Sequence, residues 1–157
     1  MSFGVTKIQT PAAKHLFQTR DTTKISKEKA EAFHTWAAKG LFLCQGSRLD
    51  TQMAVAFLCT RVKNPDEDDW KKLIRLLCYL RTIKNLFLTL EADNLNDATW
   101  WAYDAFAVHP DYKSHTGGLL SYGKGAIQTM SRKQKLNTKS STQAELVGPD
   151  DILSSLL

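Results

Sequence analysis

The stretch Thr99-Trp-Trp-Ala-Tyr-Asp-Ala-Phe-Ala-Val108 contains the residues that decide the fold class. Aromatic residues are enriched in strands, so this run predicts a strand. Residues 86–90 predict an earlier strand, and residues 118–130 predict a hairpin with Gly123-Lys-Gly125 at or near its turn. A final helix is expected to begin near residues 140–142.

The residues before Asn85 predict three helices. The first has Ser26 as its N-cap and presents apolar side chains at helical spacing, namely Phe33, Trp36, Ala37, Leu41 and Cys44. The second opens at Asp50, and the third follows Pro65. Helices followed by strands and a last helix predict an α+β fold, with a helical segment at 1–90 and a β-rich segment at 91–157.

The acidic run at the start of the third helix, residues 66–69, has two interpretations. Carboxylates at a helix N-terminus interact favourably with the helix dipole, and one of them can cap the helix. A metal site is the less favoured alternative.

The composition is that of an ordinary globular protein, with 43% apolar and 24% charged residues in 157. Three cysteines without metal-ligand spacing indicate reduced thiols in an intracellular protein. The chain begins without the apolar core of a signal peptide, and no apolar run approaches the roughly 20 residues that cross a bilayer. We therefore expect a soluble intracellular protein that does not contact membranes.

Positive charge is concentrated in the second half of the chain. Between Tyr112 and Ala144 there is no Asp or Glu, while the same window holds six basic residues, Lys113, Lys124, Arg132, Lys133, Lys135 and Lys139. Such a field attracts polyanions, and binding them releases counterions. A solvated surface is the simpler alternative for a basic run, but this pattern favours a nucleic-acid partner.

Asp104 on the predicted strand and Glu145 in the first turns of the last helix are the candidate metal ligands. Carboxylates from a strand and a helix can hold divalent ions, and two ions about 4 Å apart can cleave a phosphodiester. Glu145 also has a structural alternative. With Thr142 as N-cap it would complete a capping box, which the spacing alone favours.

Two other patterns carry less weight. Residues 118–125 lack the hydroxyl that a P-loop uses to bind Mg²⁺, and they are expected to form a hairpin. His109 and His115 do not have zinc-ligand spacing, so we expect loop histidines that contact backbone or phosphate.

Several motifs in fixed order resemble the RNase H region of copia-type LTR retrotransposon Pol polyproteins. They are Phe106–Asp111, Ser114–Gly118, Gly123–Ile127 and Lys133–Glu145. Upstream, Phe33–Val62, Pro65 and Leu77–Arg81 resemble the segment that joins reverse transcriptase to RNase H. The resemblance covers roughly residues 10–157 and implies a thumb- or connection-like segment at 1–90.

For residues 91–157 the resemblance implies an incomplete RNase H-like mixed sheet, with a three-strand meander and a helix. The family degrades the RNA strand of RNA–DNA hybrids with two Mg²⁺ ions held by carboxylates. Glu145 stands at the family's second carboxylate, with Asp104 as the nearest candidate for the first. The resemblance also implies hybrid contacts by Ser141 and Thr142 and phosphate contacts by Arg132, Lys133, Lys135 and Lys139.

The chain departs from the family pattern in three ways. The first carboxylate is expected at position 103, where this chain has Tyr103, and a one-residue slip would turn Asp104 to the wrong face unless a bulge corrects it. Pro149 is expected to kink the last helix, at about 3 kcal/mol. The sequence ends 12 residues after Glu145, before the family's remaining carboxylates and the strand beside the first one.

These departures lead us to expect a Pol fragment that is inactive alone, has an open sheet edge and has the missing Pol segments as potential partners. Two alternatives stay open. One is a non-catalytic module that binds nucleic acid through its basic stretch, and the other is an untranslated genomic relic.

Overall fold

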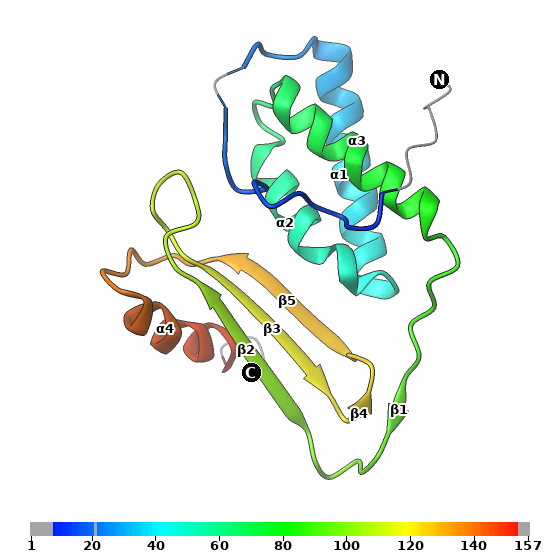
Figure 1. The fold of residues 1–157 in the computed structure, drawn as a ribbon, viewed down its shortest axis with the longest axis vertical. Coiled ribbons are helices and arrows are strands. Elements are labelled where there is room, and N and C mark those ends of the chain that lie inside the picture. The colour runs from blue at the N-terminus through cyan, green and yellow to red at the C-terminus, as the bar shows by residue number, and fades with distance from the viewer. Residues whose placement is uncertain (1–7, 21, 154–157) are drawn as a thin grey trace. The chain divides into compact units, whose positions relative to one another are not determined.

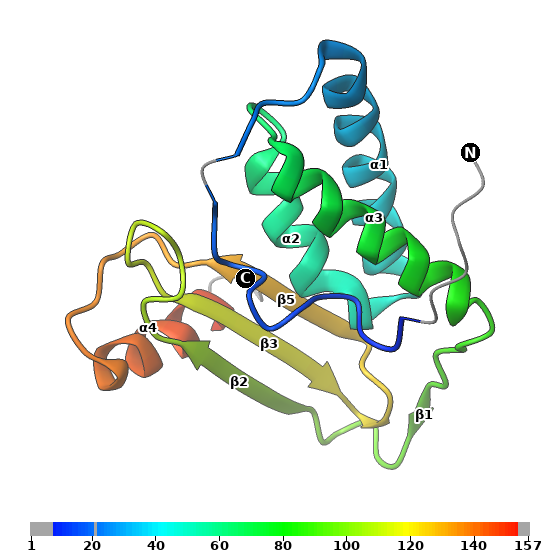
Figure 2. The ribbon, with the colours of Figure 1, turned by 45° about the horizontal axis from the view of Figure 1, so that its top comes forward.

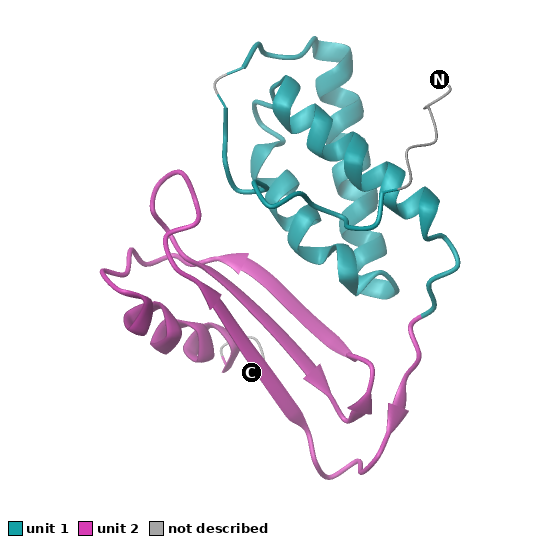
Figure 3. Cartoon of the chain, in the orientation of Figure 1, with its two compact units in different colours: residues 1–87 teal, residues 88–157 magenta. Residues whose placement is uncertain are grey.

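Within residues 8–20 and 22–153, three α-helices precede residue 87, and a strand meander with one α-helix follows it (Figure 1). This computed structural model describes residues 8–20 and 22–153. It confirms the predicted α+β fold with a helical N-terminal segment. Two compact units divide at residues 87 and 88, whereas the sequence placed the division after residue 90 (Figure 3).

The helical unit consists of α1 (Lys27–Gly46), a short 3₁₀ turn (Leu49–Thr51), α2 (Gln52–Arg61) and α3 (Glu67–Thr82). Ser26 caps α1 as predicted, because its hydroxyl accepts a hydrogen bond from the backbone N–H of Lys29 at 3.3 Å. Apolar side chains from all three helices form one core, and its fully buried members include Phe33, Cys44, Val55, Phe57, Leu58 and Leu73.

The buried face of α1 differs from the prediction at two positions. Trp36 and Leu41 were expected to face the core, but they are 43% and 42% exposed. Gly40 lies on the same face and is buried where α2 approaches closely. A Cβ added at Gly40 would lie 3.3 Å from a methyl group of Val55. The glycine thus permits close helix packing in place of a side chain.

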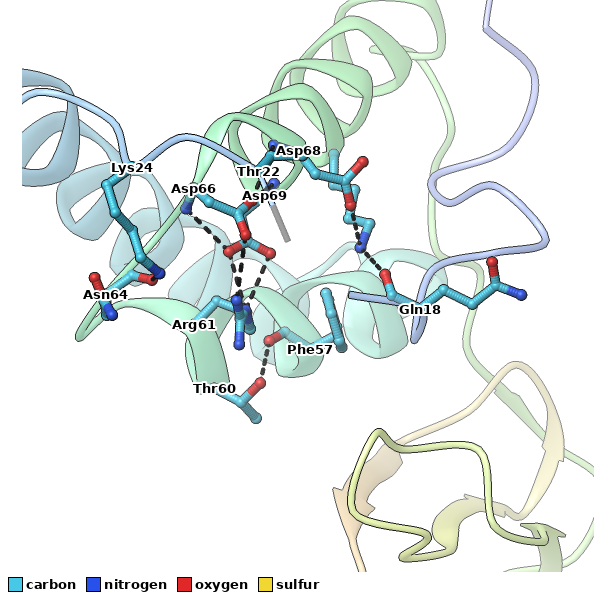
Figure 4. A network of polar contacts seen from close by, with 11 residues as sticks. Gln18, Thr22, Lys24, Phe57, Thr60, Arg61, Asn64, Asp66, Asp68 and Asp69 are labelled. Carbon is cyan, nitrogen blue, oxygen red and sulfur yellow. Dashed lines mark hydrogen bonds and ion pairs between the residues drawn. The ribbon is translucent and has the colours of Figure 1, made fainter. Parts of the chain in front are cut away.

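The start of α3 is a polar junction, drawn in Figure 4. The Asp66 carboxylate accepts hydrogen bonds from the backbone N–H groups of Asp68 and Asp69, both at 2.9 Å. The Asp69 carboxylate accepts one in return from the Asp66 backbone at 3.2 Å. Arg61 from α2 contacts both carboxylates, at 3.0 and 3.5 Å. The predicted cap is therefore confirmed, and the acidic run caps and anchors the helix.

The second unit contains one three-stranded antiparallel sheet of order β2-β3-β5. Its strands are β2 (Thr99–Ala105), β3 (His115–Ser121) and β5 (Gln128–Lys133). The predicted hairpin is present, because β3 pairs with β5 around residues 123–125. Two-residue strands β1 (Glu91–Ala92) and β4 (Gly123–Lys124) form a separate pair.

Residues 86–90 do not form the strand predicted for them. They have strand-forming side chains, but only the following β1 has a strand beside it. Strand propensity reflects packing against neighbours, so without a partner the run stays irregular. Several of its apolar side chains are exposed, including Leu86, Phe87 and Leu90.

The helix α4 (Ser141–Leu153) lies along one face of the sheet, as Figures 1 and 2 show. Gly118 on β3 lets it approach, since a Cβ there would lie 3.1 Å from the side chain of Ile152. Pro149 was expected to kink this helix, but the helix continues through it to Leu153. The hydrogen bond that Pro149 removes belongs to the carbonyl of Glu145, an exposed residue, where solvent can replace it. Within the described ranges, no helix has the length and apolar character needed to cross a membrane.

Candidate carboxylate site and basic surface

The Asp104 side chain projects from β2 toward α4, where its carboxylate is contacted from β3, from Gln134 and from the helix. Its Oδ1 accepts a hydrogen bond from the Thr116 hydroxyl on β3 at 2.6 Å and another from the Gln134 amide at 3.0 Å. Gly148 of α4 packs directly against the carboxylate, so closely that a Cβ at this position would overlap it. One strand, its neighbour and the helix therefore fix the position of this acid.

The Asp104 side chain points to the opposite face of β2 from the one that the one-residue slip predicted. Its side chain faces α4, while Tyr103 lies on the other face and is 83% exposed. The pairing of β2 with β3 runs without interruption from Thr99↔Ser121 to Ala105↔His115, so no bulge is involved. Register alone decides the face, and this register directs position 104 to the helix.

Gln134 is a site residue that the sequence analysis missed. It is 1% exposed, and its amide nitrogen donates to Asp104, to the Thr116 hydroxyl at 2.9 Å and to the backbone carbonyl of Ala144 at 3.1 Å. It thereby ties the end of β5 to β2, β3 and α4. A glutamine between two lysines gives no sequence signal for such a role, because the role depends on the packing of three elements.

Glu145 lies on the exposed side of the first turns of α4. The capping box between Thr142 and Glu145, the alternative that spacing alone favours, is not seen in the described residues. Ser140 is the capping residue, since its hydroxyl accepts from the backbone of Gln143 at 3.2 Å. The Gln143 side chain accepts in turn from the backbone N–H of Lys139 at 2.7 Å. With the cap satisfied by other residues, the Glu145 carboxylate is not used in it.

Asp104 and Glu145 come from elements that pack together. Glu145 precedes Gly148 by three residues, nearly one helical turn, so its side chain starts next to the residue that touches Asp104. Two carboxylates suit a single hard cation that keeps several waters, but a two-ion site needs more ligands. Across residues 8–20 and 22–153, no cluster of three or more His, Cys, Asp or Glu could hold a metal. The described residues therefore do not fit the pair of Mg²⁺ ions that the resemblance implies.

The basic residues expected to contact phosphate differ in their availability. Lys133 forms a 2.6 Å ion pair with Asp111, and the hydrogen bond from Lys133 holds the pKa of the Asp111 carboxyl below its usual value. Arg132 is half-buried, and two of its guanidinium nitrogens are buried without a hydrogen-bond partner. Lys135 and Lys139 are exposed, and neither has an ion pair within the described part of the chain.

The exposed lysines precede the start of α4, where Ser141 and Thr142 are also exposed in the first turn. Hydroxyls and backbone N–H groups at a helix N-terminus, next to two cations, form a surface suited to phosphate. The residues predicted to contact the hybrid or its phosphates therefore include four that lie on one exposed segment, namely Lys135, Lys139, Ser141 and Thr142.

His109 and His115 are both buried, contrary to the expectation of two loop histidines on backbone or phosphate. His109 Nε2 lies 3.0 Å from His115 Nδ1, and His115 Nε2 lies 2.7 Å from the Ser131 hydroxyl. Burial, followed by repulsion from His109, lowers the pKa of His115 to about 4. Burial also lowers the pKa of His109. At neutral pH the two rings are therefore uncharged and join the strands to the loop at 106–114.

The carboxylates, the buried glutamine and the exposed lysines all belong to the second unit. Comparisons of this chain with protein-family models, with curated proteins and with solved structures found no match.

Proposed function

We propose that this chain derives from a copia-type retrotransposon Pol protein. In this proposal, residues 91–157 are the first half of an RNase H-like domain, and residues 1–90 belong to the segment that follows reverse transcriptase. The proposal is supported by the motifs and by one structural observation. An aspartate on the first strand of an antiparallel meander faces the helix whose first turns carry Glu145.

The parent activity would be hydrolysis of the RNA strand in RNA–DNA hybrids, with two Mg²⁺ ions bound by several carboxylates. In the described residues, one Asp104 oxygen already accepts hydrogen bonds from Thr116 and Gln134, and no group of three or more His, Cys, Asp or Glu could hold a metal. Activation of water and stabilisation of a leaving oxygen both require metal ions at fixed positions. We therefore infer that this chain binds hybrids without cleaving them.

The cleavage test uses the purified chain, a labelled RNA–DNA hybrid and Mg²⁺. We expect product at the level of the no-protein control, and the same level for Glu145→Gln. Because Glu145 is exposed and outside the helix cap, this substitution removes a potential metal ligand without disturbing the fold. Robust cleavage that Glu145→Gln abolishes would contradict the proposed lack of activity.

A second candidate function, a non-catalytic nucleic-acid-binding module, is favoured by the exposed pair Lys135 and Lys139. Binding through these lysines predicts an affinity that falls as salt rises. Neutralising both, as Lys135→Gln with Lys139→Gln, should lower the salt-dependence slope by about 2, since each phosphate contact contributes about 0.9.

Lys133→Gln is the matched control for that experiment, because Lys133 is already paired with Asp111. It should change the slope by less than half as much as the double variant. Fluorescence anisotropy with an RNA–DNA hybrid and a DNA duplex of the same sequence would measure both slopes. Salt-independent binding, or equal effects of the two variants, would count against this surface. A clear preference for the hybrid would favour the RNase H-like origin over a general binding module.

A further inference from the structure

We propose that the outer edge of β2 is a self-association surface that pairs antiparallel with β2 of a second copy of this chain. In the sheet order β2-β3-β5, β2 is an edge strand seven residues long. In the described ranges its backbone pairs only with β3. Half of its N–H and C=O groups therefore point away from the sheet and are available to another strand.

The sequence and pairing of β2 lack the prolines, basic residues and bulges by which proteins often protect edge strands. Thr99–Ala105 contains no proline, lysine, arginine or glycine, and its pairing with β3 has no bulge. Its only charge belongs to Asp104, whose carboxylate is turned toward α4 and hydrogen-bonded there. An approaching strand would thus meet neither a repelling charge nor an irregular backbone.

The side chains of β2 are complementary to themselves in one register. With a twofold axis through Ala102, Trp101 of each copy faces Tyr103 of the other. Both lie on the sheet face opposite α4, where Trp101 is 50% and Tyr103 is 83% exposed. Two aromatic cross-strand pairs would then cover these rings on both copies.

The same register also avoids unfavourable pairs at the remaining positions. Thr99 faces Ala105 of the second copy, and Trp100 faces Asp104, so no two like charges lie opposite each other. This self-complementarity at every position of the register favours a second copy as the occupant. Two three-stranded sheets would join into one continuous sheet of six strands.

Salt separates this association from nucleic-acid binding. Each copy has a formal net charge of +5, so salt screens the repulsion between copies and should strengthen the dimer. Binding of nucleic acid weakens with salt instead. The inference is independent of the proposed function, and either one can fail without the other.

The test is sedimentation velocity of the full chain over a wide concentration range, at low and high salt. We expect the mass to rise from 17.7 kDa toward twice that value. Tyr103→Lys should weaken the dimer at least tenfold, because it removes both aromatic cross-strand pairs and adds a positive charge to the edge of each copy. Tyr112→Lys is the matched control. Tyr112 is 77% exposed in the same unit but lies outside β2, so this variant should associate like the original chain.

A cross-linking experiment tests the register. Ala102→Cys should form a disulfide-linked dimer on mild oxidation, with the introduced thiol identified by peptide mapping, because this position faces itself across the axis. Thr99→Cys should not, since Thr99 faces Ala105. A chain that stays monomeric at every concentration, or a dimer that Tyr103→Lys leaves unchanged, would overturn the proposal. A monomer whose binding to single-stranded nucleic acid is lost in Tyr103→Lys would assign these aromatic residues to base stacking instead.

Discussion

Gly148 is the residue at which α4 comes closest to the candidate acid. Replacing it with alanine would push a methyl group into the Asp104 carboxylate. That carboxylate cannot move freely, because Thr116 and Gln134 hold it. We expect Gly148→Ala to destabilise the second unit by about 1–3 kcal/mol, the usual cost of inserting a methyl group into a packed site. Hydrogen exchange of β2 and β3 at increasing denaturant concentrations would measure this loss in the free energy of unfolding.

Gly117→Ala provides the control in the same unit. A Cβ at Gly117 would make only ordinary contacts, the nearest being the Tyr103 carbonyl at 3.7 Å. Its backbone also does not require a positive φ. We therefore expect Gly117→Ala to be neutral or slightly stabilising. Equal losses for the two alanine variants would show that loss of glycine in itself, rather than contact with Asp104, determines stability here.

At this scale the sequence predicted which residue types occupy the site but not where they point. Asp104 was expected on the wrong face of its strand, and it faces α4. Spacing alone favoured Thr142 as the cap of α4, but Ser140 accepts the capping hydrogen bond. A strand residue's direction depends on pairing with a distant strand, and three neighbouring hydroxyl residues compete for one cap. Neither choice can be made from spacing alone.

Among the elements, α3 depends on a junction between its own N-terminus and the last turn of α2. Asp66 caps the helix, and Asp69 completes the box while binding Arg61 (Figure 4). We expect Asp66→Ala to lower the stability of the helical unit by about 1–2 kcal/mol, since it removes two hydrogen bonds to the helix N-terminus. Circular dichroism during denaturation would measure the loss, because this unit contains most of the helix.

Asp66→Asn separates the cap from the ion pair. Asparagine caps helices about as well as aspartate, but it carries no charge for Arg61. We expect this variant to retain most of the stability that Asp66→Ala loses, because the Asp66–Arg61 distance of 3.5 Å marks the weaker of the two Arg61 contacts. A loss as large as that of Asp66→Ala would show that the ion pair, rather than the cap, stabilises this junction.

Elements defined by local signals were predicted well, whereas those that need partners were not. The N-caps of α1 and α3 and the hairpin of β3 with β5 follow from nearby residues, and the structure contains all three. The strand predicted at 86–90 is absent, because strand formation requires a neighbouring strand.

The two units of the molecule contain ionisable groups whose shifted pKa values affect stability in different pH ranges. In the second unit, burial and then the neighbouring His109 lower the pKa of His115 from 6.5 to about 4. Between these two pH values, His115 is protonated in the unfolded chain but stays neutral in the folded unit. Its stability is therefore fully present above pH 6.5 and falls as the pH falls toward 4. The shift corresponds to about 3 kcal/mol at most. The lowered pKa of His109 acts in the same direction.

The helical unit responds only at lower pH. For Asp50 and Asp66, burial raises the pKa, but hydrogen bonds outweigh it and hold both values below 3.8. Their contributions are present above that value and are lost below it. The pKa of Asp69 is raised by burial, so protonation of Asp69 favours the folded state as the pH falls through its raised pKa. These three carboxylates therefore do not destabilise the helical unit between pH 6.5 and 4.

We consequently expect the two units to lose stability in a fixed order on acidification, with the strands opening before the helices. Hydrogen exchange at pH 7, 5.5 and 4.5, corrected for intrinsic rates, should show protection falling first in β2, β3 and β5. His115→Asn should flatten this dependence, because asparagine does not titrate in this range, even if it lowers stability at every pH. Protection that is lost first in α1–α3, or a pH dependence unchanged in His115→Asn, would show that other groups control the acid response.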